Sequence, residues 1–141
     1  MIKTFIFILL VSLSSGVSAS EFHSYFRCFT LHDKKSINIK YVNFFSTKDK
    51  ADIGYVKYEK SDIAIPLVFV KDDEMLIDDR PSIYTIVWSE IIDGKVNGTY
   101  TVMSQGTRFF GFTYTNKKNK SVEFEENWDA YDEEKGDCIW K

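Results

Sequence analysis

Short runs in which apolar and polar residues alternate follow one another along most of the chain. In one of them Ile37, Ile39 and Tyr41 alternate with Asn38 and Lys40. Alternation with a period of two places successive side chains on opposite faces of a strand. One face is therefore apolar and the other is exposed to solvent. Turn residues separate such runs at intervals of roughly eight to twelve residues. The pattern therefore predicts an antiparallel β meander.

The predicted strands cover most of the chain beyond its first twenty residues. The run 63–70 is dense in apolar residues, which predicts a strand buried on both faces, and Pro66 within it predicts an edge position or a bulge. The acidic run 71–80 is expected to be a loop, and one helical turn is expected around 128–131. The predicted strands are 22–31, 37–41, 51–58, 63–70, 82–92, 99–103, 107–115, a strand around 122–124, and 137–140.

Two dipeptides compete to form the hairpin turn after the strand 82–92. Asp93-Gly94 suits a type I′ turn, because both central residues of that turn have positive φ. Asn97-Gly98 suits the same turn. A turn at the second dipeptide would shift the register of the returning strand and bury its other face.

The N-terminal segment has the pattern of an export signal. Lys3 is followed by an apolar stretch over 5–13, and Val17-Ser18-Ala19 resembles a signal-peptidase site. The apolar stretch is about half the length that a membrane span needs. We therefore expect residues 1–19 to be a signal peptide and residues 20–141 to be a single β domain without a membrane anchor, located in the periplasm or secreted.

The chain has two cysteines, Cys28 and Cys138, near the two ends of this expected domain. An even number of cysteines in an exported chain predicts a disulfide. Such a bond would join the first and last strands of the meander. The expected fold is all-β, with eight or nine antiparallel strands closed as a small barrel or sandwich.

Composition and motifs exclude several classes of function. The formal net charge of −3 argues against a nucleic-acid partner, which would require a basic face. With only His23 and His32 and no ligand spacing that suits zinc, no metal site and no cofactor are expected. None of the common catalytic signatures occurs, so the expected protein is not an enzyme. The segment 123–137 has eight acidic residues and one basic residue, which predicts a solvated acidic rim.

Aromatic residues are concentrated on two predicted strands. Phe110, Phe112 and Tyr114 are expected to share one face of the strand 107–115, with Trp88 and Tyr84 on an earlier strand. They could form the core through cross-strand pairs. Alternatively, they could line a barrel interior that holds a small apolar ligand.

The polar loop 104–109 bends at a glycine and ends in arginine and an aromatic residue, both common at binding surfaces. The cysteine in the first strand, this loop, the aromatic strand, the lysine-rich turn after it and the closing cysteine together resemble the periplasmic or membrane-bound inhibitors of c-type lysozyme. In that family a disulfide closes a small barrel, and a loop reading approximately S-x-S-G-A-R-Y enters the lysozyme cleft. In this chain Gln105 separates the serine from the glycine, and Phe109 stands at the tyrosine position. The residues that would contact a partner are Ser104, Gln105, Gly106, Arg108, Phe109 and Lys117.

The expected function is therefore that of an exported protein that binds and blocks another protein. The partner would be a cell-wall hydrolase or an incoming antibacterial effector, the latter making this an immunity protein. Such partners are often basic, and the acidic segment would steer them electrostatically. The alternative is a barrel that binds a small apolar ligand.

Overall fold

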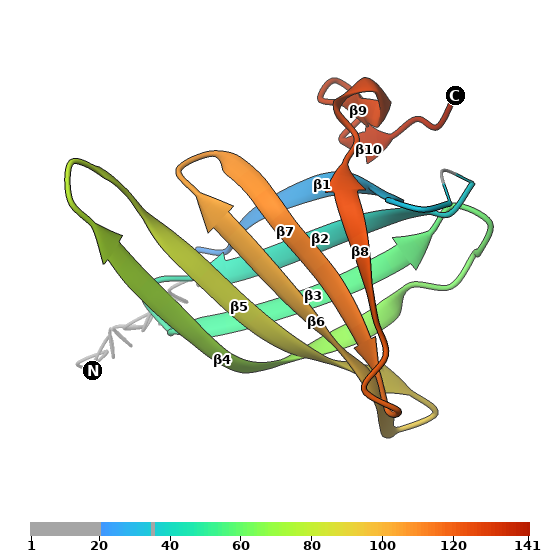
Figure 1. The fold of residues 1–141 in the computed structure, drawn as a ribbon, viewed down its shortest axis with the longest axis horizontal. Coiled ribbons are helices and arrows are strands. Elements are labelled where there is room, and N and C mark those ends of the chain that lie inside the picture. The colour runs from blue at the N-terminus through green and yellow to red at the C-terminus, as the bar shows by residue number, and fades with distance from the viewer. Residues whose placement is uncertain (1–20, 35) are drawn as a thin grey trace, which may run out of the picture.

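Eight strands form one antiparallel meander, and the first strand pairs with the eighth, so the sheet closes into a barrel (Figure 1). The computed structural model describes residues 21–34 and 36–141. The all-β prediction is confirmed, and of its two forms the barrel is the one that occurs. The expected signal peptide, residues 1–19, lies outside the described residues. None of the helices in the described part of the chain is long and apolar enough to span a membrane.

Most strand positions agree with the alternation of the sequence. Two short strands follow the barrel, of which the second lies within the predicted strand 137–140 and the first was not predicted. The elements are β1 (His23–Leu31), β2 (Asn38–Ser46), β3 (Ala51–Tyr58), β4 (Ile65–Ile77), β5 (Arg80–Ile92), β6 (Lys95–Gln105), β7 (Arg108–Asn116), β8 (Ser121–Glu126), the 3-10 turn η1 (Trp128–Ala130), β9 (Tyr131–Asp132) and β10 (Asp137–Cys138).

β4 differs from its prediction in two respects. The acidic run expected to be a loop is strand as far as Ile77, because β5 continues to pair with it up to Ile77 and Arg80. The expectation of burial on both faces is wrong, since Leu67 is buried while Val68 is about half exposed. Pro66 pairs with β3 and not with β5, which is the edge position that a residue without an N–H tolerates.

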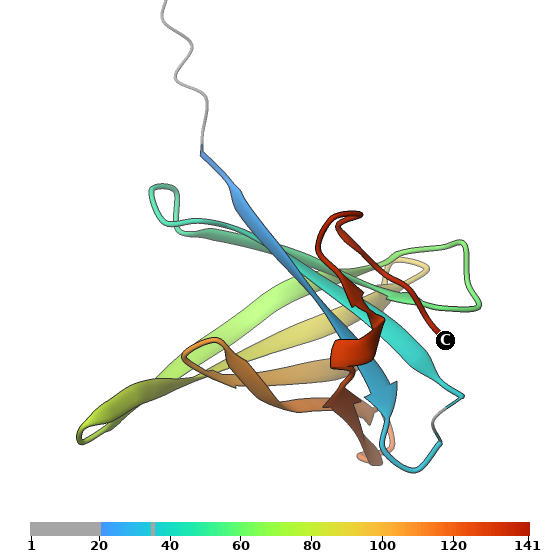
Figure 2. The ribbon, with the colours of Figure 1, turned by 90° about the horizontal axis from the view of Figure 1, so that it is seen from above.

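The strands of the barrel pair with their neighbours over unequal lengths. β5 and β6 pair over ten positions, whereas β1 and β8 pair over three and β3 and β4 over four. Beyond Val68, β4 continues without β3 as a neighbour, and its hairpin with β5 diverges from β1 and β2 at this end of the barrel (Figure 2). One end of the barrel is therefore narrow and the other is open.

Aromatic side chains fill the narrow part of the barrel. Phe29 and Phe112 stack with ring centroids 4.2 Å apart, and the indole N–H of Trp88 donates to the Tyr41 hydroxyl at 3.1 Å. These side chains and Tyr100 are almost completely inaccessible to solvent. Of the aromatic residues singled out in the sequence, Trp88, Phe112 and Tyr114 belong to or pack against this core, whereas Tyr84 and Phe110 are exposed.

A buried carboxylate closes the narrow end. Glu90 is 3% exposed and accepts hydrogen bonds from Asn97 Nδ2 at 2.7 Å, the Tyr114 hydroxyl at 3.0 Å and the Tyr100 hydroxyl at 3.3 Å. Three donors compensate for the water that the carboxylate loses. Gly98 is required beside this network, because a Cβ there would lie 2.5 Å from the Tyr114 hydroxyl oxygen.

The hairpin turn between β5 and β6 is Asp93-Gly94. Both residues have positive φ, at 51° and 71°, as a type I′ turn requires. Asn97-Gly98 lies within β6 instead, next to a register shift in the pairing with β5. Of the two dipeptides that could form this turn, Asp93-Gly94 is therefore the one that does.

The disulfide between Cys28 and Cys138 is present, with the two Cα atoms 5.8 Å apart. We expected the strand that carries Cys138 to return to the barrel sheet, and it does not. Cys138 belongs to β10, which pairs only with β9 and lies on the outside of β1 (Figure 1). Tyr131 of β9 stacks on Phe26 at 4.6 Å, which fixes the hairpin to the wall. A disulfide of this kind is compatible with an oxidising compartment outside the cytoplasm.

Candidate binding cleft at the open end of the barrel

The inward-facing positions of several strands continue past the core into the open end. On β2, Ile39 and Tyr41 pack in the core, and the next two inward positions are Asn43 and Phe45. On β5 the core residue Trp88 is followed toward the open end by Ile86. Because side chains alternate across a strand, these additional residues face the space between the diverging walls.

This space is a cleft of about 910 Å³. Apolar and aromatic side chains make up much of its wall, and polar groups are placed among them. The volume falls within the range of small-molecule sites, which are concave, mainly apolar and have few polar groups. The lining residues are Tyr25, Asn43, Phe45, Ser46, Thr47, Lys50, Asp52, Phe69, Asp72, Tyr84, Ile86 and Ser104.

Asn43 is a buried polar residue in the cleft wall. It is 2% exposed, and its Nδ2 donates to the Tyr25 hydroxyl at 3.1 Å. No donor from the described part of the chain reaches its Oδ1. Buried amide oxygens are nearly always hydrogen-bonded, so an unpaired oxygen at this position is unusual for a purely structural residue.

Two carboxylates belong to the same inner face. Asp52 of β3 is paired in register with Phe45, and Asp72 of β4 with Ile86. Partial burial raises the pKa of Asp52, a hydrogen bond from Asn43 opposes this increase, and the negative charge of Asp72 adds to it. The two acids therefore lie close enough to repel each other.

The loop predicted to bind a partner lies on the rim of this end. Ser104 lines the cleft, and Gln105 Nε2 donates to the carbonyl of Pro81 at 2.9 Å. Gly106 has a φ of +58°, and Arg108 is exposed. The loop is thus tied to β5 at one side while its arginine is free to meet solvent.

Phe109 does not project from this loop. It packs inward, 5.7 Å from Tyr25 between ring centroids, with the Arg27 guanidinium 4.8 Å above its ring. Ser104 pairs with Phe109 and Met103 with Gly111, so Phe110 is the extra residue of a β-bulge. Because of this bulge, Phe110 is 45% exposed, and the expectation that it shares a face with Phe112 is wrong.

Lys117 lies far from the other predicted partner residues. It follows the end of β7, whereas Arg108 begins that strand. Nine residues of extended chain span roughly 25 to 30 Å. The structure therefore brings Ser104, Gln105, Gly106, Arg108 and Phe109 together and places Lys117 at the opposite end of the barrel.

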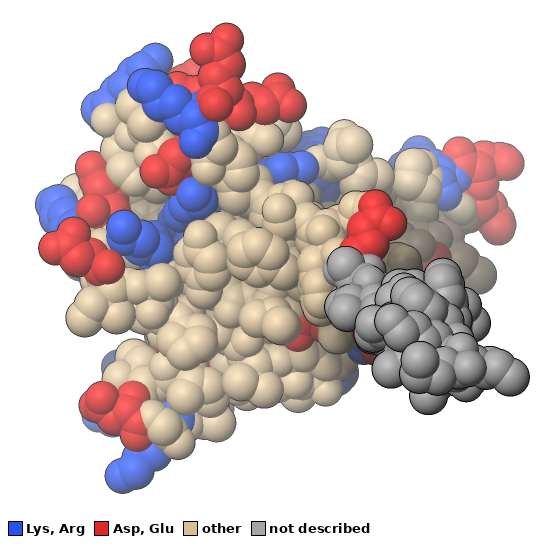
Figure 3. Space-filling model, turned by 180° about the vertical axis from the view of Figure 1, so that it is seen from behind, with Lys and Arg blue, Asp and Glu red and all other residues tan. Residues whose placement is uncertain are grey.

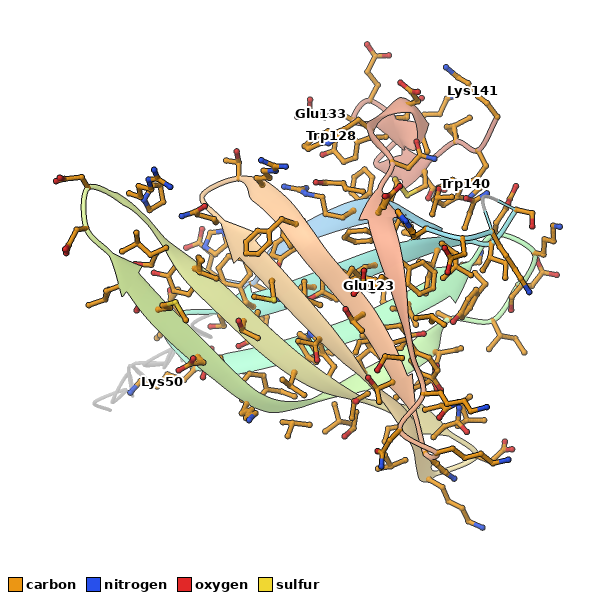
Figure 4. All side chains as sticks on the ribbon, in the orientation of Figure 1. Lys50, Glu123, Trp128, Glu133, Trp140 and Lys141 are labelled. Atoms are coloured by element: carbon orange, nitrogen blue, oxygen red, sulfur yellow. A yellow bond between two sulfur atoms is a disulfide. The ribbon has the colours of Figure 1, made fainter. Side chains whose placement is uncertain are left out.

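Two ion pairs join the acidic segment to β1 and β2. Glu126 pairs with Arg27 at 3.3 Å, and Asp137 with Lys40 at 2.8 Å. Burial raises the pKa of Glu126 although Arg27 opposes the shift, and the hydrogen bond from Lys40 lowers the pKa of Asp137. The description as a solvated rim fits only part of this segment, such as Glu133, which extends into solvent (Figure 4).

The outer wall carries a row of apolar side chains. Phe44, Ile53 and Val68 are neighbours across β2, β3 and β4, and Ile53 and Val68 are each more than half exposed. Figure 3, which views the molecule from behind, shows charged side chains around the margins and few in the middle of this face. Exposed apolar rows of this kind occur at protein contacts.

Most cleft residues were not identified from the sequence. One signal was present, because the alternation of β2 continues beyond Tyr41 and places polar Asn43 where an apolar residue would extend the core. The positions of Asp52 and Asp72 depend on how far β3 and β4 stay paired, and no local pattern encodes this. Within the described residues, no group of three or more His, Cys, Asp or Glu side chains could hold a metal ion.

Comparison with known proteins identifies no similar protein. No protein-family model, no curated protein and no solved structure matches the chain. The cleft and its surroundings are therefore the basis on which function is inferred.

Proposed function

We propose that this protein is an exported binding protein that takes up a small, largely apolar ligand in the cleft at the open end of its barrel. The observation that carries the proposal is the cleft itself, about 910 Å³, enclosed by inward-facing side chains of β1 to β6. Aromatic residues fill the barrel interior at the narrow end. A barrel whose narrow end is packed with side chains and whose open end is a largely apolar cleft is suited to holding a ligand.

Displacement of a neutral fluorescent dye tests this proposal. N-phenyl-1-naphthylamine should bind the native protein saturably, with increased fluorescence, and 1-octanol should displace it. Ile86→Trp should fill the cleft and weaken dye binding at least tenfold. The matched control is Ile92→Trp, on the same strand but outside the cleft, and it should bind like the native protein.

Two results would contradict the proposal. One is the absence of saturable dye binding to the native protein. The other is equal binding by the two tryptophan variants, provided that both retain the native near-ultraviolet circular dichroism. Such equality would place the dye elsewhere on the surface.

Inhibition of another protein is a second candidate, and the exposed apolar row of Phe44, Ile53 and Val68 favours it. A row of this kind can pack against a partner while the rim loop contacts it through Arg108. By its resemblance to the lysozyme inhibitors, this candidate would act on a cell-wall hydrolase or an antibacterial effector.

An activity assay with c-type lysozyme tests the second candidate. The native protein should lower the rate of cell-wall lysis in a saturable way. Ser104→Ala with Arg108→Ala should weaken inhibition at least tenfold, and so should Ile53→Asp if the outer wall takes part. The same lysis rate with and without the protein, or unchanged inhibition by the double variant, would refute the loop-mediated mechanism.

Export to the periplasm or the exterior belongs to the same proposal. It is supported by the disulfide and by the pattern of residues 1–19. N-terminal sequencing of protein recovered outside the cytoplasm should begin at Ser20. Recovery of the chain from the cytoplasm with Met1 retained would contradict export.

A further inference from the structure

The pairing between β3 and β4 ends on the side of the barrel that forms the cleft. The ladder between these strands ends at Ile53 and Val68. Asp52 comes directly before that point on β3, and Asp72 lies on the continuation of β4 beyond it. The two carboxylates therefore lie on neighbouring strands beyond the end of this ladder, and the strand registers turn both toward the cleft.

Neither carboxylate has a cationic partner within the part of the chain that the structure describes. The ion pairs there involve other acids, at Glu125, Glu126, Asp132 and Asp137. Lys50 also lines the cleft, but the ion pairs of the described residues do not include it. The repulsion between Asp52 and Asp72 is thus left without a compensating charge, and it adds to the effect of burial, which is the main cause of the raised pKa of Asp52.

The surroundings supply further groups that suit a cation. The Asn43 amide, buried beside Asp52, has an Oδ1 that accepts no hydrogen bond from the described residues. Tyr25 and Phe69 also line the cleft, and the faces of aromatic rings attract organic cations. An ammonium group has three donors and no acceptor, which matches two carboxylates and an amide oxygen.

We infer that the ligand of this cleft is a small organic ammonium ion, with its charged nitrogen between Asp52 and Asp72 and its apolar body against the aromatic wall. This inference rests on the proposed ligand-binding function and specifies the class of ligand. An anionic amphiphile, such as a fatty acid, is disfavoured because its carboxylate would lose water beside two like charges. A neutral ligand of the same size gains the apolar contacts alone.

Three competitors with the same eight-carbon chain separate the contribution of the charge from that of the apolar body. Octylammonium, 1-octanol and octanoate each displace N-phenyl-1-naphthylamine from the native protein at pH 7. Octylammonium should act at a concentration at least tenfold lower than 1-octanol, and octanoate should be the weakest. A tenfold difference corresponds to about 1.4 kcal/mol, which a hydrogen bond to a charged group can supply.

The double variant Asp52→Asn with Asp72→Asn should bring octylammonium to within twofold of 1-octanol and leave 1-octanol unchanged. The matched control is Asp62→Asn with Asp93→Asn, which changes the net charge equally at the opposite end of the barrel. The control should keep the tenfold preference for octylammonium over 1-octanol, because this preference requires negative charges beside the bound ammonium group and does not depend on the net charge of the protein. Loss of the preference in both variants would contradict the assigned site.

The outcomes distinguish this inference from the function on which it rests. If the native protein binds no dye, the ligand-binding proposal fails. If the dye binds and octylammonium displaces it no better than 1-octanol, that proposal stands and the assignment to an ammonium ion is wrong.

Discussion

Removal of the disulfide should leave the fold intact and lower its stability by about 4 to 5 kcal/mol. The change is Cys28→Ala with Cys138→Ala, which opens a covalent loop whose ends are 110 residues apart. In the chain-entropy model, a loop of about this length restricts the unfolded chain by nearly 5 kcal/mol at 25 °C. The folded state loses little, because the bond lies outside the barrel ladder.

Other contacts should keep the C-terminal hairpin in place without the disulfide. The Lys40 ammonium donates to Asp137 at 2.8 Å and to the carbonyl of Gly136 at 3.1 Å. The backbone N–H of Asn127 donates to the carbonyl of Cys28 at 2.8 Å. The predicted loss is therefore in the global free energy of unfolding and not in the local attachment of β9 and β10.

Urea unfolding of the native and double-alanine proteins measures this loss. The midpoint should fall and the m-value should rise, since the unfolded chain without the cross-link is less compact and exposes more surface. Tryptophan fluorescence, which includes Trp128 just before the hairpin of β9 and β10 and Trp140 just after it, should change together with the far-ultraviolet circular dichroism. A loss below about 1 kcal/mol would refute the entropic argument. A separate early fluorescence transition would show that the hairpin detaches by itself.

Three further changes test the ion contact, the narrow end and the core. The hydrogen bond to Glu125 raises the pKa of His32 above 6.5, so Glu125→Gln should return that pKa toward 6.5 in an NMR titration. Because His32 is charged when protonated and its pKa is raised, the contact with Glu125 stabilises the folded state at lower pH. This stabilisation is lost as pH rises through the pKa of His32 in the folded state. Gly98→Ala should displace the Tyr114 hydroxyl, 2.5 Å from the new Cβ, and destabilise by about 1 to 3 kcal/mol in urea. Phe112→Ala should cost about 3 to 5 kcal/mol, because this ring is buried in the core.

Each of these changes has a result that would contradict its reasoning. An unchanged titration of His32 in the glutamine variant would mean that another group sets its pKa. Native stability of Gly98→Ala would show that the Glu90 network adjusts without loss. A loss below about 2 kcal/mol for Phe112→Ala would indicate that the surrounding rings collapse into the space.

The strands could be predicted because their signal is local. Period-two alternation and the Asp93-Gly94 turn specify neighbouring residues, and both agree with the barrel. The bulge at Phe110 could not be predicted, since it appears only when β7 is paired with β6. Likewise, the strand character of β4 as far as Ile77 depends on its pairing with β5 and not on its acidic composition.

The candidate site was less accessible to sequence reasoning than the fold. The loop 104–109 was identified from its residue types, and its position on the rim agrees with an exposed role for Arg108. The cleft beneath it arises from the divergence of the walls beyond the short ladder of β3 and β4. Asp52 and Asp72 are twenty residues apart in sequence and meet only because of this geometry.

The closing seam of the barrel also determines the order in which the protein can be completed. β1 is synthesised before the other strands, yet its second neighbour is β8, and the partner of Cys28 is made 110 residues later. Contacts so distant in sequence form slowly. Until the C-terminal part of the chain is made, β1 therefore lacks its second neighbour and Cys28 lacks its disulfide partner. A foreign thiol or disulfide that captures Cys28 in this period would block the correct bond before its partner exists.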